Sequence, residues 1–353
     1  MLSFVYDVLP GRVVFGAGCL DRLPDEIERL GATRALVLCT SEQRQEGRKV
    51  LEQLGSRAVG LFDKAVMHVP IEIAHAARAE AVRSGADCCV SVGGGSTTGL
   101  AKAIALVSTL PILAIPTTYA GSEMTPIWGI TEGGVKKTGR DPRVLPRTVL
   151  YDPTLTITMP ATLSATSGMN SIAHCVEALY SKDANPIISL IAEEGIRALA
   201  LGLPEVVKDP RNLDARSNAL YGAWLGGMAL GAVGMALHHK LCHTLGGSFN
   251  LPHAETHTVV LPHATAYTAP AAGEAMLRIA RALGVQSAPR GLYDLAASLG
   301  APLSLAALGM QSADLGKAAD IAVQNPYYNP RPITREGVRA LLQDAFDGRR
   351  PAA

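Results

Sequence analysis

The chain has 353 residues, of which 48% are hydrophobic and 18% charged, and its formal net charge at pH 7 is +1. A chain of this length and composition can bury two hydrophobic cores. Its balanced charge gives no support for a nucleic acid or a polyanionic surface as partner.

Both the N-terminus and the cysteines indicate a protein of the reducing cytoplasm. No basic segment precedes an apolar run at the start, so we expect no signal peptide. The apolar stretch 223–237 is Gly-rich and typical of a buried helix, so we expect no membrane contact. The cysteine spacing matches neither a disulfide framework nor a zinc ribbon. We predict reduced, buried thiols and a cytoplasmic protein.

The first half of the chain alternates short β-branched segments with helical ones. We predict strands at 35–39, 58–62, 87–92 and 111–115, and helices at 42–54, 71–84 and 98–107. Strands separated by helices of this length are typical of βαβ units and a mostly parallel sheet. Residues 124–151 are turn-rich and predict a β-hairpin that closes the first domain.

From Met159 onward the strand signal nearly disappears. Ala/Leu-rich segments predict helices at 161–179, 187–201, 214–232, 236–246, 275–283, 292–299, 312–322 and 334–346. We therefore predict an α/β domain over residues 1–155 and an all-α domain over residues 156–353.

Two polar loops follow neighbouring strands of the first domain. Gly93, Gly94 and Gly95 let backbone N–H groups approach an anion, and a helix N-terminus near Ser96 attracts it. The loop lacks the G-x-G-x-x-G spacing and alone fits a plain tight turn equally well. The second loop carries hydroxyl groups able to bond a ribose or phosphate, at Thr117, Thr118, Tyr119 and Ser122. Together the two loops favour a nucleotide.

The second domain concentrates its histidines in segment 237–264, which holds six of the nine: His238, His239, His243, His253, His257 and His263. His239 and His243 are four residues apart in a predicted helix and therefore share a face. We expect Gly246 and Gly247 to end this helix, and Pro252 to precede a new start at His253. Any one histidine is more often a core residue, but the cluster points to metal ligands or proton donors. The HAETH segment at 253–257 lacks the residue order of a zinc protease.

Four segments together resemble the iron-containing alcohol dehydrogenase family over nearly the whole chain: GGGS followed by Ala101-Lys102, IPTTYAGSE, GMNSIAHCVEALY and HHKLCHTLGGSFNLPHAETHTVVLPH. The resemblance implies a dehydroquinate synthase-like architecture. In it, a Rossmann-like nucleotide-binding domain and a helical domain enclose an active site in the cleft between them. It also implies NADH or NADPH bound on the GGGS loop, and a homodimer.

The resemblance adds cofactor contacts outside the two loops. Thr40 lies where relatives that favour NAD often carry an Asp, and Lys137 lies near a cofactor-contacting Lys. Thr40 has no charge to repel a 2′-phosphate, so NADPH is compatible with it. Arg44 and Arg48 are near enough in sequence to meet that phosphate, although ordinary surface positions are expected for both.

The resemblance also implies a metal site, from which this sequence departs. The family's ligands are an Asp and three His, and the matching residues here are Asn170, His174, His239 and His253. Asn170 replaces the only anionic ligand by a neutral amide, which removes most of the charge compensation for a divalent ion. Three histidines hold zinc in other proteins, but we predict that this protein requires no metal.

A reaction that suits this departure is reduction of a C=C bond conjugated to a ketone. Hydride adds β to the carbonyl, and an imidazole can stabilise the resulting enolate. The resemblance is greatest to members that reduce maleylacetate to 3-oxoadipate in aromatic catabolism, on the segments GGGSTTGLAKAIAL, PTTYAGSEMTPIWGITE and NPYYNPRPIT. We predict that His243 and His253 stabilise the enolate and donate the proton, in an order left open. Asn170, His174 and His239 would line the former metal position.

The expected substrate is a small dicarboxylate, which needs cationic partners. Lys136, Lys137, Arg140 and Arg331 are candidates, and Tyr327 and Tyr328 either shape the pocket or only pack. The leading alternative is a metal-dependent alcohol dehydrogenase of the same family. Glycerol dehydrogenase and dehydroquinate synthase share the scaffold but need a complete metal site. A non-catalytic nucleotide-binding protein is a third class, which an NADH-consumption assay would separate.

Overall fold

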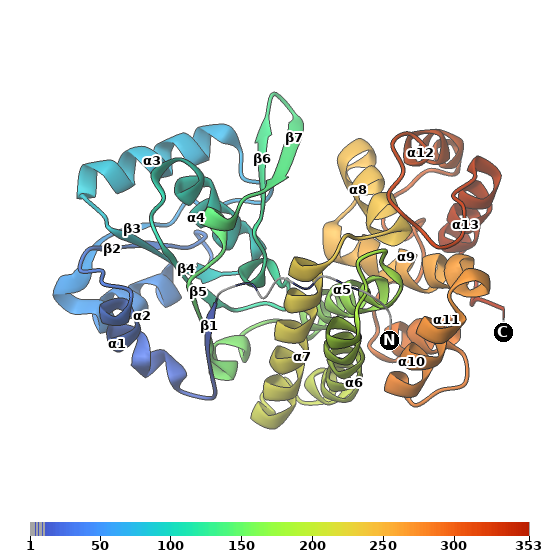
Figure 1. Ribbon diagram of the computed structural model, residues 1–353, viewed down its shortest axis with the longest axis horizontal. Helices are drawn as coiled ribbons and strands as arrows, with labels where there is room; N and C mark the ends of the chain where they lie inside the picture. The colour runs from blue at the N-terminus through green and yellow to red at the C-terminus, as the bar shows by residue number, and fades with distance from the viewer. Residues whose placement is uncertain (1–3, 5, 7–8, 10, 353) are drawn as a thin grey trace. The chain divides into compact units, whose positions relative to one another are not determined.

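The structure is a computed structural model that describes residues 4, 6, 9 and 11–352. The described chain divides into two compact units: the first lies within residues 9–158, and the second combines residues 159–352 with Phe4 and Tyr6. Figure 1 shows strands in the first unit and helices alone in the second. Each unit is described by itself.

The first unit is built on a six-stranded sheet of order β1-β8-β5-β4-β2-β3, with every neighbouring pair parallel. Its strands are β1 (Arg12–Phe15), β2 (Ala35–Leu38), β3 (Ala58–Phe62), β4 (Cys88–Gly93), β5 (Ile112–Pro116) and β8 (Thr148–Tyr151). The four predicted strands are confirmed as β2 to β5, to within one residue at each end. Strands β1 and β8 were not predicted, because each has only four residues and so carries little periodic signal.

Helices cover both faces of this sheet. Alternate residues of one strand point to opposite faces, so Leu36 and Leu38 pack toward α3 (Ile71–Ser84) and α4 (Gly95–Ser108). Ala35 and Val37 pack on the other face, toward α1 (Leu23–Arg29) and α2 (Arg44–Leu54). Burial on both faces explains why β2 is an uninterrupted apolar run.

The predicted hairpin is present as β6 (Ile127–Glu132) and β7 (Val135–Arg140), which pair only with each other. Its turn is Gly133-Gly134, and both residues have positive φ. The hairpin does not close the domain, however. The chain returns through β8, which pairs with β1 and β5 inside the main sheet.

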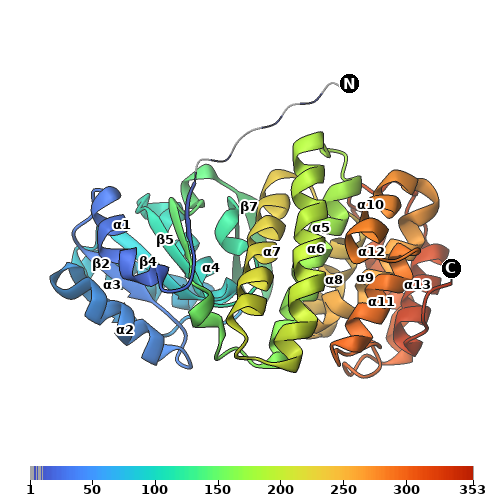
Figure 2. The same cartoon turned by 90° about the horizontal axis from the view of Figure 1, so that it is seen from below.

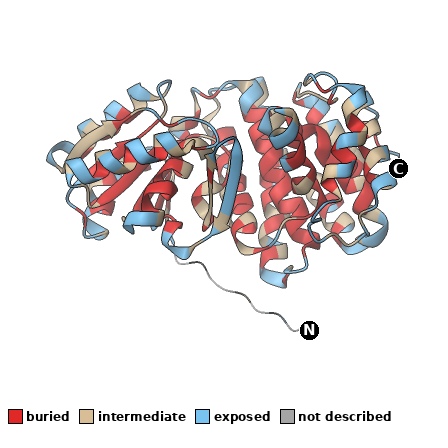
Figure 3. Cartoon of the chain, turned by 90° about the horizontal axis from the view of Figure 1, so that it is seen from above, coloured by how far each residue is buried: buried red, intermediate tan, exposed pale blue. Residues whose placement is uncertain are grey.

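The second unit consists of helices: α5 (Ala161–Tyr180), α6 (Pro186–Lys208), α7 (Leu213–Ala232), α8 (Leu237–Phe249), α9 (His253–Thr268), α10 (Gly273–Leu283), α11 (Ala288–Ser298), α12 (Leu315–Ala322) and α13 (Arg335–Asp347). Every residue of α5 from Ser164 to Tyr180 is buried, and Figure 2 shows α5, α6 and α7 side by side. Figure 3 shows that long stretches of these helices are coloured as buried.

The predicted end of α8 is wrong. The helix continues through Gly246 and Gly247 and stops at Asn250, which adopts the left-handed conformation at φ 54°. A residue in that conformation ends a helix, and asparagine tolerates it. Helix α9 starts at His253 directly after Pro252, as expected.

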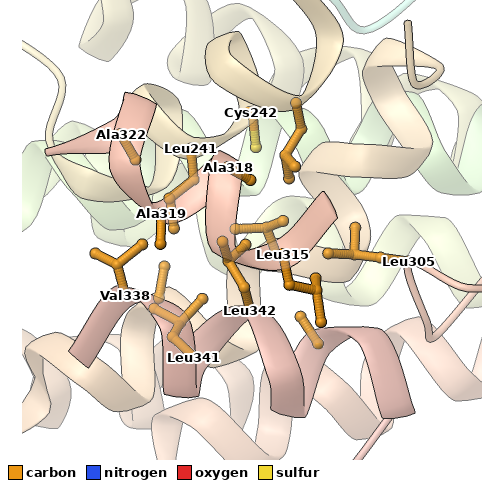
Figure 4. Close-up of a cluster of buried hydrophobic side chains, with 14 of the residues drawn as sticks. Leu241, Cys242, Leu305, Leu315, Ala318, Ala319, Ala322, Val338, Leu341 and Leu342 are labelled. Carbon is orange, nitrogen blue, oxygen red and sulfur yellow. The ribbon is translucent and has the colours of Figure 1, made fainter. Parts of the chain in front are cut away.

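The C-terminal helices hold α8 in place through an apolar cluster. Leu241 and Cys242 of α8 pack with Leu315 of α12 and with Val338 and Leu342 of α13, as Figure 4 shows. No single helix in the described part of the chain is long and apolar enough to span a membrane. Helices α7 and α8 reach that threshold only as a pair bent by 95°.

Candidate active site

The two predicted nucleotide loops lie against each other at the carboxyl edge of the sheet. Gly93 ends β4, Gly94 caps α4, and the backbone N–H of Thr117 donates to the carbonyl of Gly93 at 3.1 Å. A Cβ atom at Gly93 would lie 2.5 Å from Oε1 of Gln43, and one at Gly94 would lie 3.0 Å from the Thr118 side chain. Glycine at these two positions therefore lets the Gln43 and Thr118 side chains lie close to the backbone of the loop.

The Gly93–Gly95 loop after β4 borders the point where the strand order reverses, and the segment after β2, with Thr40 and Gln43, borders it on the other side. The chain leaves β2 toward β3 on one side and leaves β4 toward β5 on the other. Open α/β sheets bind ligands in the crevice at such a point. Gln43, which the sequence did not single out, donates from Nε2 to the hydroxyl of Thr117 at 2.7 Å and so bridges the ends of β2 and β5.

The other predicted cofactor residues differ in their surroundings. Ser96 lies in the first turn of α4, Tyr119 is fully buried, and the carbonyl of Ser122 accepts a hydrogen bond from the buried Lys102. Thr40 follows β2. Lys137 lies on the hairpin and pairs with Glu132 at 2.5 Å.

Two predicted cations already have partners. Arg44 forms an ion pair with Asp63, so a 2′-phosphate would have to compete with that carboxylate. Arg331 stacks on Tyr267 at 4.2 Å from the ring centroid and donates to the Tyr267 carbonyl at 3.0 Å. Arg331 therefore packs on Tyr267 in the structure, and its contact with substrate stays a prediction.

In the second unit, three helices bring histidine rings together. His174 of α5 lies 5.2 Å from His239 of α8, measured between ring centroids, and His257 of α9 lies 4.9 Å from both His238 and His239. All four rings are buried. The predicted convergence of His174 and His239 is therefore found, with His257 added at the centre.

Glu177 forms hydrogen bonds to the segment of chain that carries His238 and His239. The fully buried carboxylate accepts hydrogen bonds from the backbone N–H groups of Ala236 and His238 and from Nδ1 of His239, each at 2.7 Å. A proton on Nδ1 leaves Nε2 of His239 as the acceptor facing the cluster. Burial lowers the pKa of His238 and of His239, and it raises the pKa of Glu177.

The two predicted catalytic histidines lie at the exposed rim of the cluster. Nδ1 of His243 lies 3.2 Å from the hydroxyl of Tyr327, and its ring is 6.1 Å from that of His239. The ring of His253 lies 4.3 Å from that of His257, one helical turn further along α9. Both are exposed, so an incoming ligand can reach them while the buried rings lie behind.

The donors at the family's ligand positions do not suit a divalent iron. Oδ1 of Asn170, Nδ1 of His174 and Nε2 of His239 are buried without a hydrogen-bond partner in the described chain. This set is electrically neutral, whereas iron and similar ions are normally balanced by an anionic ligand. Glu177 cannot supply that ligand, because its oxygens are engaged behind His239. Water or substrate oxygens can instead satisfy these atoms.

The sequence analysis gave four residues of this site no definite role: Glu177, His257, Tyr327 and Lys240. Glu177 lies three residues after His174 on α5 and could have been found as a carboxylate on the same helical face. His257 is four residues after His253 on α9. The roles of Tyr327 and Lys240 could not have been found from the sequence, because Tyr327 and α8 are far apart along the chain.

Comparison with known proteins agrees with this arrangement. The family model "Iron-containing alcohol dehydrogenase" matches residues 10–153, and its C-terminal counterpart matches residues 164–346. Maleylacetate reductase of Burkholderia cepacia is 62% identical over 352 residues, covering 100% of both chains. That of Sphingobium indicum is 58% identical, covering 99% of both.

Solved structures agree with these family and sequence matches. Maleylacetate reductase from Rhizobium sp. strain MTP-10005 superposes with a TM-score of 0.97 at 53% identity, covering 99% of this chain and 100% of that one. A putative alcohol dehydrogenase from Ralstonia eutropha JMP134 gives a TM-score of 0.98 at 62% identity, covering 100% of both. The chain therefore belongs to the iron-containing alcohol dehydrogenase family, and within that family it groups with the maleylacetate reductases.

Proposed function

We propose that this protein reduces the conjugated C=C bond of maleylacetate to give 3-oxoadipate, with NADH or NADPH as hydride donor. The observation that carries the proposal is its full-length similarity to curated maleylacetate reductases, at 62% and 58% identity. The exposed imidazoles beside a neutral, amide-containing cluster support the same reaction.

The reaction needs one hydride and one proton. The dihydronicotinamide transfers hydride to the carbon β to the ketone, and the electron pair of the double bond moves into an enolate. His243, backed by the Tyr327 hydroxyl, is placed to stabilise an enolate oxygen, and His253 is placed at the same rim to protonate the α carbon. The opposite assignment of the two histidines uses the same atoms and is equally open.

We propose that the nicotinamide nucleotide binds on Gly93–Ser96 and on the loop from Thr117 to Ser122. The crevice at the strand reversal and the close backbone approach at Gly93 support this site. A homodimer and a cytoplasmic location belong to the same proposal; the six free cysteines suit a reducing compartment.

The metal-free reaction is tested by following NADH absorbance after maleylacetate is added to chelator-treated enzyme, with metal content measured on the same sample. We expect full turnover without metal, because an enolate spreads its charge and needs no Lewis acid. Activity that appears only after Fe²⁺ or Zn²⁺ is added would contradict this and favour a metal-dependent mechanism. The same sample should not oxidise simple alcohols.

The catalytic assignment is tested by His243→Ala and His253→Ala. Each should lower kcat by about 10²- to 10⁴-fold, the usual contribution of a positioned acid or base, while NADH binding persists. The matched control is His75→Ala, since His75 is an exposed histidine on α3 of the other unit. Near-normal turnover in either rim variant would remove that histidine from the mechanism.

A further inference from the structure

Lys240 lies on α8 between two histidines of the cluster. It directly follows His239 and precedes His243 by three residues, so it projects from the same side of the helix as His243. Its ammonium lies 5.8 Å from the centroid of the Tyr327 ring, and the hydroxyl of that ring bonds His243 at 3.2 Å. One aromatic ring thus holds both the lysine and the proposed catalytic imidazole.

Lys240 is half-buried as a residue, and its ammonium forms no ion pair with an acidic side chain of the described residues. Some other cations of the helical unit do have one: Arg278 and Arg281, for example, share Glu193. A partly desolvated cation without a counter-ion is favourable chiefly when an anion joins it. The contact with the Tyr327 ring orients the ammonium but does not neutralise it.

We propose that Lys240 binds the substrate carboxylate on the ketone side and makes the enzyme specific for dicarboxylates. The inference rests on the proposed function, with His243 as the residue that stabilises the enolate oxygen. In maleylacetate this carboxylate is two carbons from the ketone, so a ketone oxygen at His243 brings it near the same face of α8. Lys240 is then a specificity-determining residue that touches substrate but takes no part in hydride or proton transfer.

The test compares two substrates in Lys240→Met. The first is maleylacetate. The second is cis-4-oxopent-2-enoate, which keeps the double bond, the ketone and one carboxylate but lacks the carboxylate on the ketone side. We expect kcat/KM for maleylacetate to fall by about 10- to 100-fold, as for loss of a charge-assisted hydrogen bond. The value for the monocarboxylate should stay within about threefold, and Lys240→Arg should retain most of the preference.

The matched control is Lys317→Met. Lys317 lies 5.9 Å from the centroid of the Phe249 ring, which is the same kind of contact in the same unit. In this variant, kcat/KM should be unchanged for both substrates. NADH affinity, measured by fluorescence titration, should be unchanged in both methionine variants.

Equal loss for the two substrates, or no loss for either, would overturn the role of Lys240. If Lys240→Met does not fold, the ratio of the two kcat/KM values in Lys240→Gln decides in its place. Failure of the wild-type enzyme to reduce maleylacetate would instead overturn the proposed function, so the two failures are distinguishable.

Discussion

At the scale of single residues, Lys102 shows how a buried amine stabilises a loop through its hydrogen bonds. The side chain is fully buried on α4, and Nζ donates to the carbonyls of Ser122, Thr125 and Ile127 at 2.6 to 2.8 Å and to the Thr125 hydroxyl at 2.9 Å. These acceptors connect the second nucleotide loop to the base of the β6–β7 hairpin. The sequence showed only a lysine after a small helical residue.

Replacing Lys102 by Met should destabilise the first unit by about 2–4 kcal/mol, because three carbonyls lose their donor in a buried site. Thermal and urea unfolding would measure the loss. Arg78→Met is the control: Arg78 is half-buried and donates twice to a single α4 carbonyl, that of Ala103. Arg78→Met should lower the free energy of unfolding by less than Lys102→Met. Equal losses would contradict the larger contribution of the Lys102 hydrogen bonds.

Residue identity alone also revealed Asn170, the departure from the family's metal-ligand pattern. An amide in place of a carboxylate is visible without any structure. By contrast, Glu177 gained its meaning only when α8 was found to bring His239 onto it. A carboxylate that fixes a histidine tautomer is a contact between helices, so its sequence spacing carries little information.

At the scale of elements, the helices of the second unit pack closely through glycines. A Cβ atom at Gly202 of α6 would lie 2.8 Å from the backbone nitrogen of Ala219 and 3.0 Å from the carbonyl of Ala215, both on α7. Backbone atoms cannot move aside as a flexible side chain can. The close approach of α6 and α7 therefore depends on this glycine.

The same substitution should have opposite effects at two helical glycines. Gly202→Ala should destabilise the protein by about 1–3 kcal/mol through overpacking. Gly247→Ala, on α8 with nothing within 4 Å of the added atom, should stabilise it by about 0.5–1 kcal/mol through lower backbone entropy in the unfolded chain. Urea unfolding of both variants gives the comparison, and a stabilising Gly202→Ala would contradict the packing.

Elements differed in how well the sequence predicted them. Strands β2 to β5 are apolar runs with helices between them, so their period and spacing determine them. The end of α8 was misplaced because Gly246 and Gly247 are compatible with both a helix and its end. The apolar contacts of α8 with α12 and α13 favour continuation of the helix.

At the scale of the whole molecule, buried histidines couple stability to pH. Burial lowers the pKa of His263 to about 4, and it lowers the pKa values of His174 and His257 below their ordinary value. In the unfolded chain these groups return to about 6.5. Below that pH the unfolded state binds more protons than the folded one, so stability falls as the pH falls.

We expect the free energy of unfolding to decrease between about pH 6.5 and pH 4, by up to about 1.4 kcal/mol per pH unit for each such histidine. His263→Gln should reduce this slope, and urea unfolding at pH 7, 6 and 5 would measure it. An exposed control, His75→Gln, should leave the slope unchanged. A wild-type stability that is flat over this range would contradict the burial of neutral histidines.

The sequence by itself determined the class of the fold, the two loops of the first unit, the histidine segment and the loss of the anionic ligand. These depend on residue type, local periodicity and spacing, which one chain displays directly. Only the tertiary structure decided that His257 lies at the centre of the cluster, that Glu177 orients His239, and that Tyr327 joins Lys240 to His243. These are contacts between residues far apart in sequence, and they depend on how helices pack rather than on any local pattern.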